Sequence, residues 1–267
     1  MKAPPFAYAK PRTLSEALEL AARPGAKLLA GGQSLIPSLN LRLSSPDLLV
    51  DINGLAELKG ITHEGGVIRI GALVTHAEIG SSDVVSKHVP LLAEAVPHIA
   101  HPAIRNRGTI GGSIALADPA AEYPACALAL EATISVQNAK GSRRIAAKDF
   151  FKGLFETELK DGEILTGVEF PAQKKGEKSA FLELARRHGD YATVGLAAFA
   201  SNGTKRLAYF GAADRAVLAA QAAKAADLES AKQALSKDLQ PPADLHHSSA
   251  TKLHLARVLL ERAWTRL

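Results

Sequence analysis

The chain has 267 residues, 47% of them hydrophobic, which is enough apolar material for one large domain or two smaller ones. Its formal net charge of +5 comes from interspersed acidic and basic residues, so a mixed solvated surface is favoured over a nucleic-acid-binding one. Aromatic residues make up only 5%, which argues against base-stacking platforms, and no apolar run reaches the roughly 18 residues of a transmembrane helix.

The cysteine content limits the disulfides and metal sites that this chain can form. Cys126 is the only cysteine, so no internal disulfide and no cysteine-rich metal or iron–sulfur site is expected on this chain. It lies in the apolar run of residues 125–130, where a buried small hydrophobe is the predicted role. The histidines show no metal-ligand spacing. With no signal-peptide pattern at the start, we expect a cytoplasmic protein.

The first part of the chain predicts a mixed α/β region. Residues 14–22 read as an amphipathic helix, 27–30 as a strand, 35–43 as a helix and 47–52 as a second strand. The runs 61–64 and 67–71 flank Gly65-Gly66, which is a hairpin signal. Thr75 and Glu78 then have the spacing of a capping box at the start of a helix.

A second region follows, with helices predicted at residues 89–100 and from Asp118-Pro119 to residue 130. Strands are expected at 133–137, 143–147 and 164–170. The charged stretch of residues 173–178 is where we place a domain boundary, giving domains of residues 1–175 and 176–267. In the second domain we expect strands at 179–187, 194–200 and 205–210, then helical stretches near 215–236 and 249–266.

Two Gly-Gly segments stand out, Ala30-Gly31-Gly32-Gln33-Ser34-Leu35 and Thr109-Ile110-Gly111-Gly112-Ser113. A turn of this kind exposes consecutive backbone N–H groups, which form a concave anion site, and a following helix N-terminus adds partial positive charge. One such Gly-Gly segment is weak evidence for a phosphate site. Two of them suggest a pyrophosphate held from both sides, and hence a dinucleotide. Neither segment matches the Rossmann fingerprint, and no P-loop is present.

A third segment stands with these two, Ala185-Arg186-Arg187-His188-Gly189-Asp190-Tyr191-Ala192. Together the three segments resemble the FAD-binding medium subunit of the molybdenum hydroxylases. This is the family of aerobic carbon monoxide dehydrogenase and xanthine dehydrogenase. The resemblance covers nearly the whole chain. It implies an α+β fold: a vanillyl-alcohol-oxidase-type (PCMH) FAD-binding domain built of two α/β subdomains, then a small C-terminal α+β domain with a three-stranded sheet. FAD would lie between these parts.

The same resemblance implies roles for individual residues. Asp118 would lie near the FAD ribose or ribityl chain, although a helix N-cap is an equal interpretation. The same two interpretations apply to Glu122, with weaker support. Leu165 would contact the flavin end through its backbone, or be a plain core residue. Ile99 and Tyr191 would flank the isoalloxazine, Tyr191 alternatively being a domain-interface tyrosine. No catalytic residue and no metal ligand is expected.

The function that the resemblance implies is electron transfer. The chain would be an oxidoreductase subunit whose FAD accepts electrons from the [2Fe–2S] clusters of a small partner subunit and passes them to a terminal acceptor. A large subunit with molybdopterin would oxidise the substrate, and the assembly would be a dimer of heterotrimers. Two alternatives stay open: a self-sufficient FAD-dependent dehydrogenase of the same superfold, and a flavin-free scaffold subunit.

Overall fold

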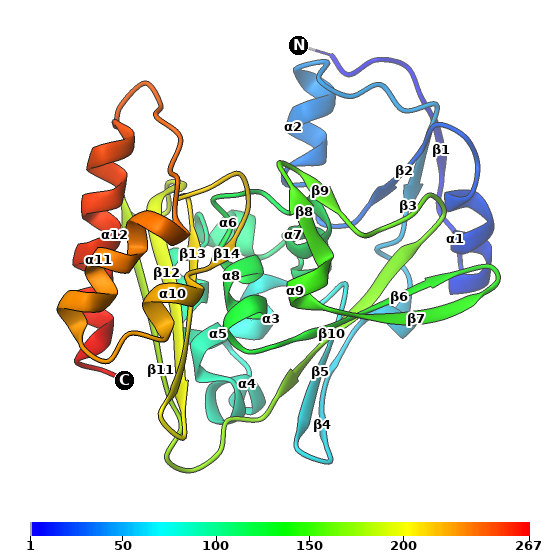
Figure 1. Cartoon of the computed structure of the whole chain (residues 1–267). Coiled ribbons are helices and arrows are strands. Elements are labelled where there is room, and N and C mark those ends of the chain that lie inside the picture. The colour runs from blue at the N-terminus through cyan, green and yellow to red at the C-terminus, as the bar shows by residue number, and fades with distance from the viewer. Residues whose placement is uncertain (1) are drawn as a thin grey trace.

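The computed structural model describes residues 2–267 and begins with a small parallel sheet. This N-terminal subdomain consists of β1 (Ala7–Ala9), α1 (Leu14–Ala21), β2 (Ala26–Leu29), α2 (Leu35–Asn40), β3 (Leu48–Asp51) and the short 3-10 helix η1 (Ala56–Leu58). β3 lies between β1 and β2 and is parallel to both. Thr13 caps α1 by accepting the N–H of Glu16, and α2 lies at the tip of this subdomain (Figure 1).

The second subdomain is a five-stranded antiparallel sheet covered by helices. Its strand order is β4 (Ile61–Glu64), β5 (Val67–Gly71), β10 (Ile164–Pro171), β6 (Thr133–Asn138) and β7 (Gly141–Ala146). The helices between β5 and β6 are α3 (His76–Gly80), α4 (Asp83–His88), α5 (Pro90–Ala95), η2 (Val96–His98), α6 (Pro102–Arg105), α7 (Ile110–Leu116) and α8 (Glu122–Ala129). After β7 come α9 (Ala147–Phe150) and the small hairpin β8 (Phe151–Gly153) and β9 (Glu156–Thr157).

The C-terminal part is an antiparallel sheet with one layer of helices. The strands follow in the order β11 (Lys178–Ala185), β12 (Ala192–Ser201), β13 (Thr204–Phe210) and β14 (Val217–Leu218). One face contacts α5 and α8, and the other is covered by α10 (Ala220–Ala223), α11 (Leu228–Asp238) and α12 (Ser249–Trp264), as Figure 1 shows. The sheet has the three strands that the sequence predicts and gains the two-residue β14.

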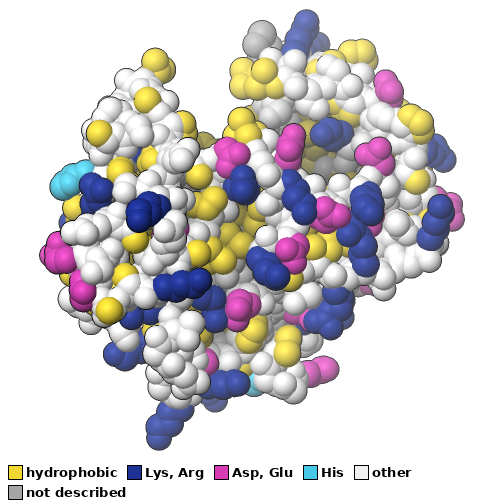
Figure 2. Space-filling view, in the orientation of Figure 1, with side chains coloured by type: hydrophobic (Ala, Val, Ile, Leu, Met, Phe, Trp, Pro, Cys, Tyr) yellow, Lys and Arg dark blue, Asp and Glu magenta, His cyan; other side chains and the backbone are white. Residues whose placement is uncertain are grey.

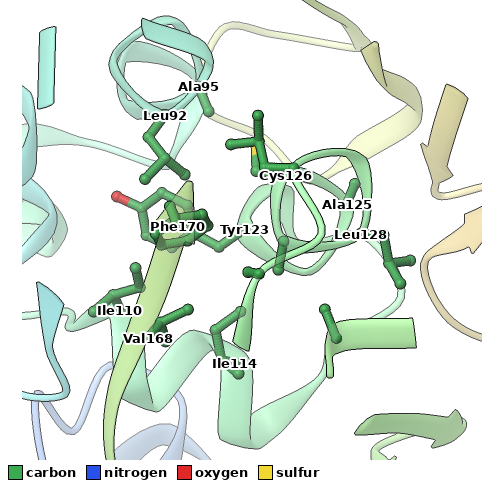
Figure 3. Close-up of a cluster of buried hydrophobic side chains, with 14 of the residues drawn as sticks. Leu92, Ala95, Ile110, Ile114, Tyr123, Ala125, Cys126, Leu128, Val168 and Phe170 are labelled. Atoms are coloured by element: carbon green, nitrogen blue, oxygen red, sulfur yellow. The ribbon is translucent and has the colours of Figure 1, made fainter. Parts of the chain in front are cut away.

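Helix α8 forms the centre of the molecule, because it lies between the two antiparallel sheets. Every residue of this helix is buried, as expected for a helix with apolar side chains all round. Tyr123 packs beside Phe170 of β10 and near Leu92 of α5 (Figure 3). Cys126 is fully buried in the same cluster, which confirms the role predicted for it, and burial raises the pKa of its thiol. This core fixes both domains against each other.

Local sequence signals predict some elements well, including the capping box and the long helix near 249–266, where α12 spans Ser249–Trp264, but misplace others. The capping box is confirmed, since Thr75 accepts the N–H of Glu78 while Glu78 accepts the N–H of Thr75. The predicted helix of residues 89–100 is shorter, because it ends in η2 at Val96–His98. The predicted helix of residues 215–236 is wrong in its first part, where β14 and α10 stand before α11 begins at Leu228. Alanine-rich sequence favours helix, but pairing with β13 overrides it here.

The boundary at residues 175/176 falls in the connection between β10 and β11 and stays a prediction. The largest core cluster extends across it, since Phe181 and Phe210 pack with residues of the second subdomain. None of the helices in residues 2–267 combines the length and apolar character needed to cross a bilayer. Within the same residues, no group of three or more His, Cys, Asp or Glu side chains could hold a metal ion.

Candidate functional site

The first Gly-Gly segment forms the loop between β2 and α2. Gly32 has φ +72°, a conformation that side chains with a Cβ rarely adopt, and a Cβ there would lie 3.1 Å from both Leu29 and Ile36. The backbone N–H groups of residues 31–35 donate no hydrogen bond to any of residues 2–267. Gln33 and Ser34 are exposed. The loop therefore offers consecutive donors to an anion.

Asn53 holds this loop against the end of the parallel sheet. Its Nδ2 donates to the carbonyl of Ala30 at 2.8 Å and to that of Leu29 at 3.3 Å. The same amide donates to Asp51 Oδ1, while Asp51 Oδ2 accepts the hydroxyl of Tyr8 at 2.6 Å. This role of Asn53 could not be predicted from the sequence, because Asn53-Gly54 indicates only a turn after a strand.

The second Gly-Gly segment is not a turn, and that part of the prediction is wrong. Gly111 and Gly112 lie in the first turn of α7, whose N-cap is Thr109. The N–H groups of Ile110 and Gly111 donate to the carbonyls of Val74 and Ala72. The N–H of Gly112 donates to the Thr109 hydroxyl at 3.1 Å. These three N–H groups therefore donate within the fold, to the helix cap and to carbonyls just after β5, and are not free to bind an anion.

The first segment nevertheless packs on Arg107 and Gly108, which directly precede the second segment. A Cβ on Gly31 would lie only 2.1 Å from the carbonyl oxygen of Arg107, and one on Gly111 would lie 2.6 Å from the oxygen of Ala72. Ala72 in turn donates its N–H to the carbonyl of Thr166, beside Leu165. The fold thus brings residues 30–35, residues 109–113 and Leu165 to one place, at the seam between the two subdomains.

Ile99 lies at the other end of the candidate site, in a loop fixed by one guanidinium group. Arg105 Nη1 donates to the carbonyls of Ile99 and Ala100, both at 2.9 Å. The turn between β11 and β12 packs on this loop, because a Cβ on Gly189 would lie 2.8 Å from the oxygen of Ala100. Ile99 is 8% exposed, whereas Tyr191, two residues beyond Gly189, is 73% exposed.

The segment around Asp118 meets the same turn. The N–H of Gly211, at the end of β13, donates to the carbonyl of Pro119 at 2.8 Å, and a Cβ on Gly211 would lie 2.9 Å from the oxygen of Ala192. Asp118, Ile99 and Tyr191 therefore come from three segments that meet where the second subdomain contacts the C-terminal domain. On the face shown in Figure 2, a hollow with hydrophobic side chains on its floor separates this domain from the N-terminal subdomain.

Asp118 does not cap a helix. Its Oδ1 accepts the N–H of Ala120 at 2.9 Å in a tight turn, and α8 begins only at Glu122 with Ala121 as its N-cap. The prediction that the helix starts at Asp118-Pro119 is wrong, because this turn comes first. Half-buried Asp118 is therefore left as a carboxyl beside the interface, and burial raises its pKa.

We expect the Arg105→Met variant to lose about 2 kcal/mol of unfolding free energy, because removal of the guanidinium leaves two carbonyls without a charged donor. Affinity for a ligand beside Ile99 should fall about tenfold. Urea unfolding and ligand titration measure both. Arg23→Met, at an exposed arginine after α1, serves as the matched control. Equal stability of the two variants would contradict this role for Arg105.

Two buried carboxyl groups lie near this interface. Burial raises the pKa of Glu122 to about 7, and the charge of Asp118 adds to the effect. Burial likewise raises the pKa of Glu183 to about 8, with a further contribution from Glu122. Glu183 Oε2 has no hydrogen-bond partner among residues 2–267 and lies 3.8 Å from His98 Nδ1. The sequence did not single out Glu183 or His98, since alternation along a strand does not tell which domain a side chain faces.

The Glu183→Gln variant should change how stability depends on pH. The carboxyl binds its proton more tightly in the folded chain than in the unfolded chain, where its pKa is near 4.5, so its contribution to stability is full below that pH and is lost as pH rises through about 8. The variant should match the parent near pH 4 and exceed it by about 2 kcal/mol above pH 8. Urea unfolding across this range measures the difference, and parallel curves would refute the assignment.

Comparison with known proteins places these features in a family. Residues 4–173 match the FAD binding domain in molybdopterin dehydrogenase, and residues 179–267 match the CO dehydrogenase flavoprotein C-terminal domain. The chain is 38% identical to the 6-hydroxypseudooxynicotine dehydrogenase complex subunit alpha of Paenarthrobacter nicotinovorans, covering 98% of this chain and 94% of the relative. It is also 38% identical to the glyceraldehyde dehydrogenase medium chain of Sulfolobus acidocaldarius, covering 99% of each.

Solved structures agree with this assignment. A carbon monoxide dehydrogenase from Hydrogenophaga pseudoflava, which lacks the Mo-pyranopterin moiety of its cofactor, superposes with a TM-score of 0.95 at 37% identity, covering 100% of this chain and 98% of that one. The fold and its two-part organisation thus define an FAD-binding oxidoreductase subunit. More narrowly, the chain belongs to the family of FAD-binding medium subunits of the molybdenum hydroxylases.

Proposed function

We propose that this chain binds FAD along the seam described above. The pyrophosphate would lie against the N–H groups of residues 31–35, with Thr109, Ile110, Gly111, Gly112 and Ser113 on the opposite side. The observation that carries the proposal is the set of unused backbone donors in a loop that packs on Arg107 and Gly108, directly before the second glycine segment. The first segment fits a dinucleotide phosphate, because its backbone donors are consecutive and are not used within residues 2–267.

The isoalloxazine would lie at the domain interface, between Ile99 and Tyr191 and near Asp118 and Leu165. Tyr191 is exposed and can pack its ring beside a flavin, while Asp118 can accept from sugar or ribityl hydroxyls. Bound FAD accepts and releases electrons singly or in pairs, which joins one-electron iron–sulfur carriers to a two-electron acceptor. The protein residues bind, orient and shield the cofactor.

The partners would be a small subunit with [2Fe–2S] clusters and a large molybdopterin subunit, assembled in the cytoplasm as a dimer of heterotrimers. In this arrangement the large subunit selects the substrate. The names of the relatives support this, because one refers to a nicotine derivative, one to glyceraldehyde and one to carbon monoxide, although all three share this fold or sequence family.

The test is an absorption spectrum of the purified chain after FAD addition and desalting. We expect the visible bands of bound flavin, and we expect their loss when reduced partner subunits and substrate are added, but not when substrate alone is added. Bleaching by substrate alone would instead identify a self-sufficient dehydrogenase. A chain that retains no flavin, even with its partners present, would be a scaffold subunit, and the proposal would fail.

A further inference from the structure

Two side-chain amides hold carbonyl groups of the first glycine loop. Asn53 Nδ2 donates to the carbonyl of Ala30 at 2.8 Å, and Gln33 Nε2 donates to the carbonyl of Gly31 at 2.9 Å. The carbonyl of Ala30 shares a peptide unit with the N–H of Gly31, and that of Gly31 shares one with the N–H of Gly32. Both of these N–H groups donate to no acceptor within residues 2–267. The amides therefore act on the peptide units that carry two of the free donors.

A peptide unit is rigid, so a bond that holds its carbonyl also sets the direction of its N–H. The peptide bonds of residues 2–267 are all trans, and in a trans unit the C=O and the N–H point in opposite directions. Because Asn53 holds the Ala30 carbonyl toward itself, the Gly31 N–H points away from Asn53. Gln33 fixes the Gly32 N–H in the same way. Donors that are already oriented lose little freedom when an anion binds.

The orientation of the Asn53 amide follows from its neighbours. Besides the carbonyls of Ala30 and Leu29, at 2.8 and 3.3 Å, its Nδ2 lies 2.7 Å from Asp51 Oδ1. All three neighbours are acceptors, so only the NH2 end of the amide fits this position. Asparagine is therefore required here as a donor.

The carboxylate of Asp51 holds Asn53 and is itself held by β1. Its Oδ1 accepts the backbone N–H of Asn53 at 3.0 Å, and its Oδ2 accepts the hydroxyl of Tyr8 at 2.6 Å. Burial raises the pKa of Asp51, but the bonds from Tyr8 and Asn53 outweigh burial and lower it overall, so the group remains an ionised acceptor. An unbroken series of hydrogen bonds thus runs from Tyr8 through Asp51 and Asn53 to the Ala30 carbonyl.

We propose that Asn53 and Gln33 are positioning residues for the pyrophosphate of FAD, and that Asp51 and Tyr8 hold Asn53 in place. This role rests on the proposed function, because the oriented N–H groups are those that would meet the phosphate. Asn53, Asp51 and Tyr8 then change the affinity for the cofactor without contacting it. Gln33 acts through the Gly31 carbonyl.

Asn53→Asp is the principal test, because it keeps the shape of the side chain but places an acceptor against Asp51 and the Ala30 carbonyl. We expect FAD affinity, measured by quenching of flavin fluorescence, to fall at least about 30-fold. Gln33→Ala, at an exposed side chain, should lower it about tenfold, and Tyr8→Phe, at the far end of the series, about threefold. Competition by ADP, which carries a pyrophosphate but no flavin, should weaken in parallel.

Phosphorus NMR of the bound cofactor separates the orientation of the donors from a general loss of stability. In variants saturated with FAD, we expect the two pyrophosphate resonances to move from their parent positions, because the N–H groups beside them have turned. Val50→Ala is the control for stability, since Val50 is fully buried on β3 beside Asp51 but takes no part in the series. Asn40→Asp, at the exposed end of α2, is the control for charge. Both controls should keep the parent's resonances and affinity.

Unchanged affinity and resonances in Asn53→Asp would overturn the role of Asn53. A loss of affinity that Val50→Ala reproduces at equal unfolding free energy would also overturn it, because the effect would then be one of stability. If Asn53→Asp does not fold, Tyr8→Phe and Gln33→Ala decide the matter, and parent-like behaviour of both would refute the proposal. Failure of the parent chain to bind FAD would instead refute the proposed function.

Discussion

The Gly31→Ala variant is expected to lose at least about 100-fold in affinity for FAD while remaining folded. A Cβ at this position would lie 2.1 Å from the carbonyl oxygen of Arg107, so the first loop must move away from the segment that leads to α7. The N–H groups of residues 31–35 would then be displaced from the proposed phosphate position. A shift of about 1 Å in several charge-assisted hydrogen bonds is worth roughly 3 kcal/mol, which is the expected loss.

Quenching of flavin fluorescence on titration with FAD measures the affinity, and circular dichroism with thermal unfolding shows whether the chain is folded. Gly54→Ala is the control, because the nearest atom to its added Cβ is Lys10 Cε at 3.7 Å. The control should bind FAD as the parent does. If Gly31→Ala also binds with unchanged affinity, close contact between the two segments is not what forms the site.

The sequence predicts the first glycine loop and the general fold because these depend on local patterns and on family motifs. Gly31 and Gly32 sit between a strand and a helix, so their loop geometry follows from near neighbours. The second pair differs because Thr109 caps a helix and Ala72 accepts the N–H of Gly111. That contact joins residues far apart in sequence, and no local pattern encodes it.

The interface end of the site shows the same limit. Ile99, Asp118 and Tyr191 could be named from the resemblance, but what brings them together is Arg105, Gly189 and Gly211. Their roles depend on the approach of two domains. Glu183 could not be predicted from the sequence for a similar reason. Phe181 packs with the second subdomain, while Leu182 packs against the C-terminal helices. Only the folded chain therefore shows which side of the sheet Glu183 faces.

The Gly195→Ala variant should lose about 3 kcal/mol of unfolding free energy, and its melting temperature should fall by roughly 6–10 °C. Gly195 of β12 pairs with Glu183 on one side and Phe210 on the other. A Cβ there would lie 1.9 Å from Phe210 Cζ. Phe210 is fully buried and stacks on Phe181 with ring centroids 5.6 Å apart, so its ring has no free space to enter.

A double-mutant cycle distinguishes this steric cause from a general weakening of the strand. Phe210→Leu alone removes ring volume and should cost about 1–2 kcal/mol, but it also makes room for the new methyl group. The double variant should therefore be more stable than the sum of the two single losses predicts, by at least about 1 kcal/mol. Additive losses would mean that alanine disturbs the backbone of β12 instead. Because β12 begins directly after Tyr191, we also expect Gly195→Ala to weaken FAD retention, and the second substitution to restore part of it.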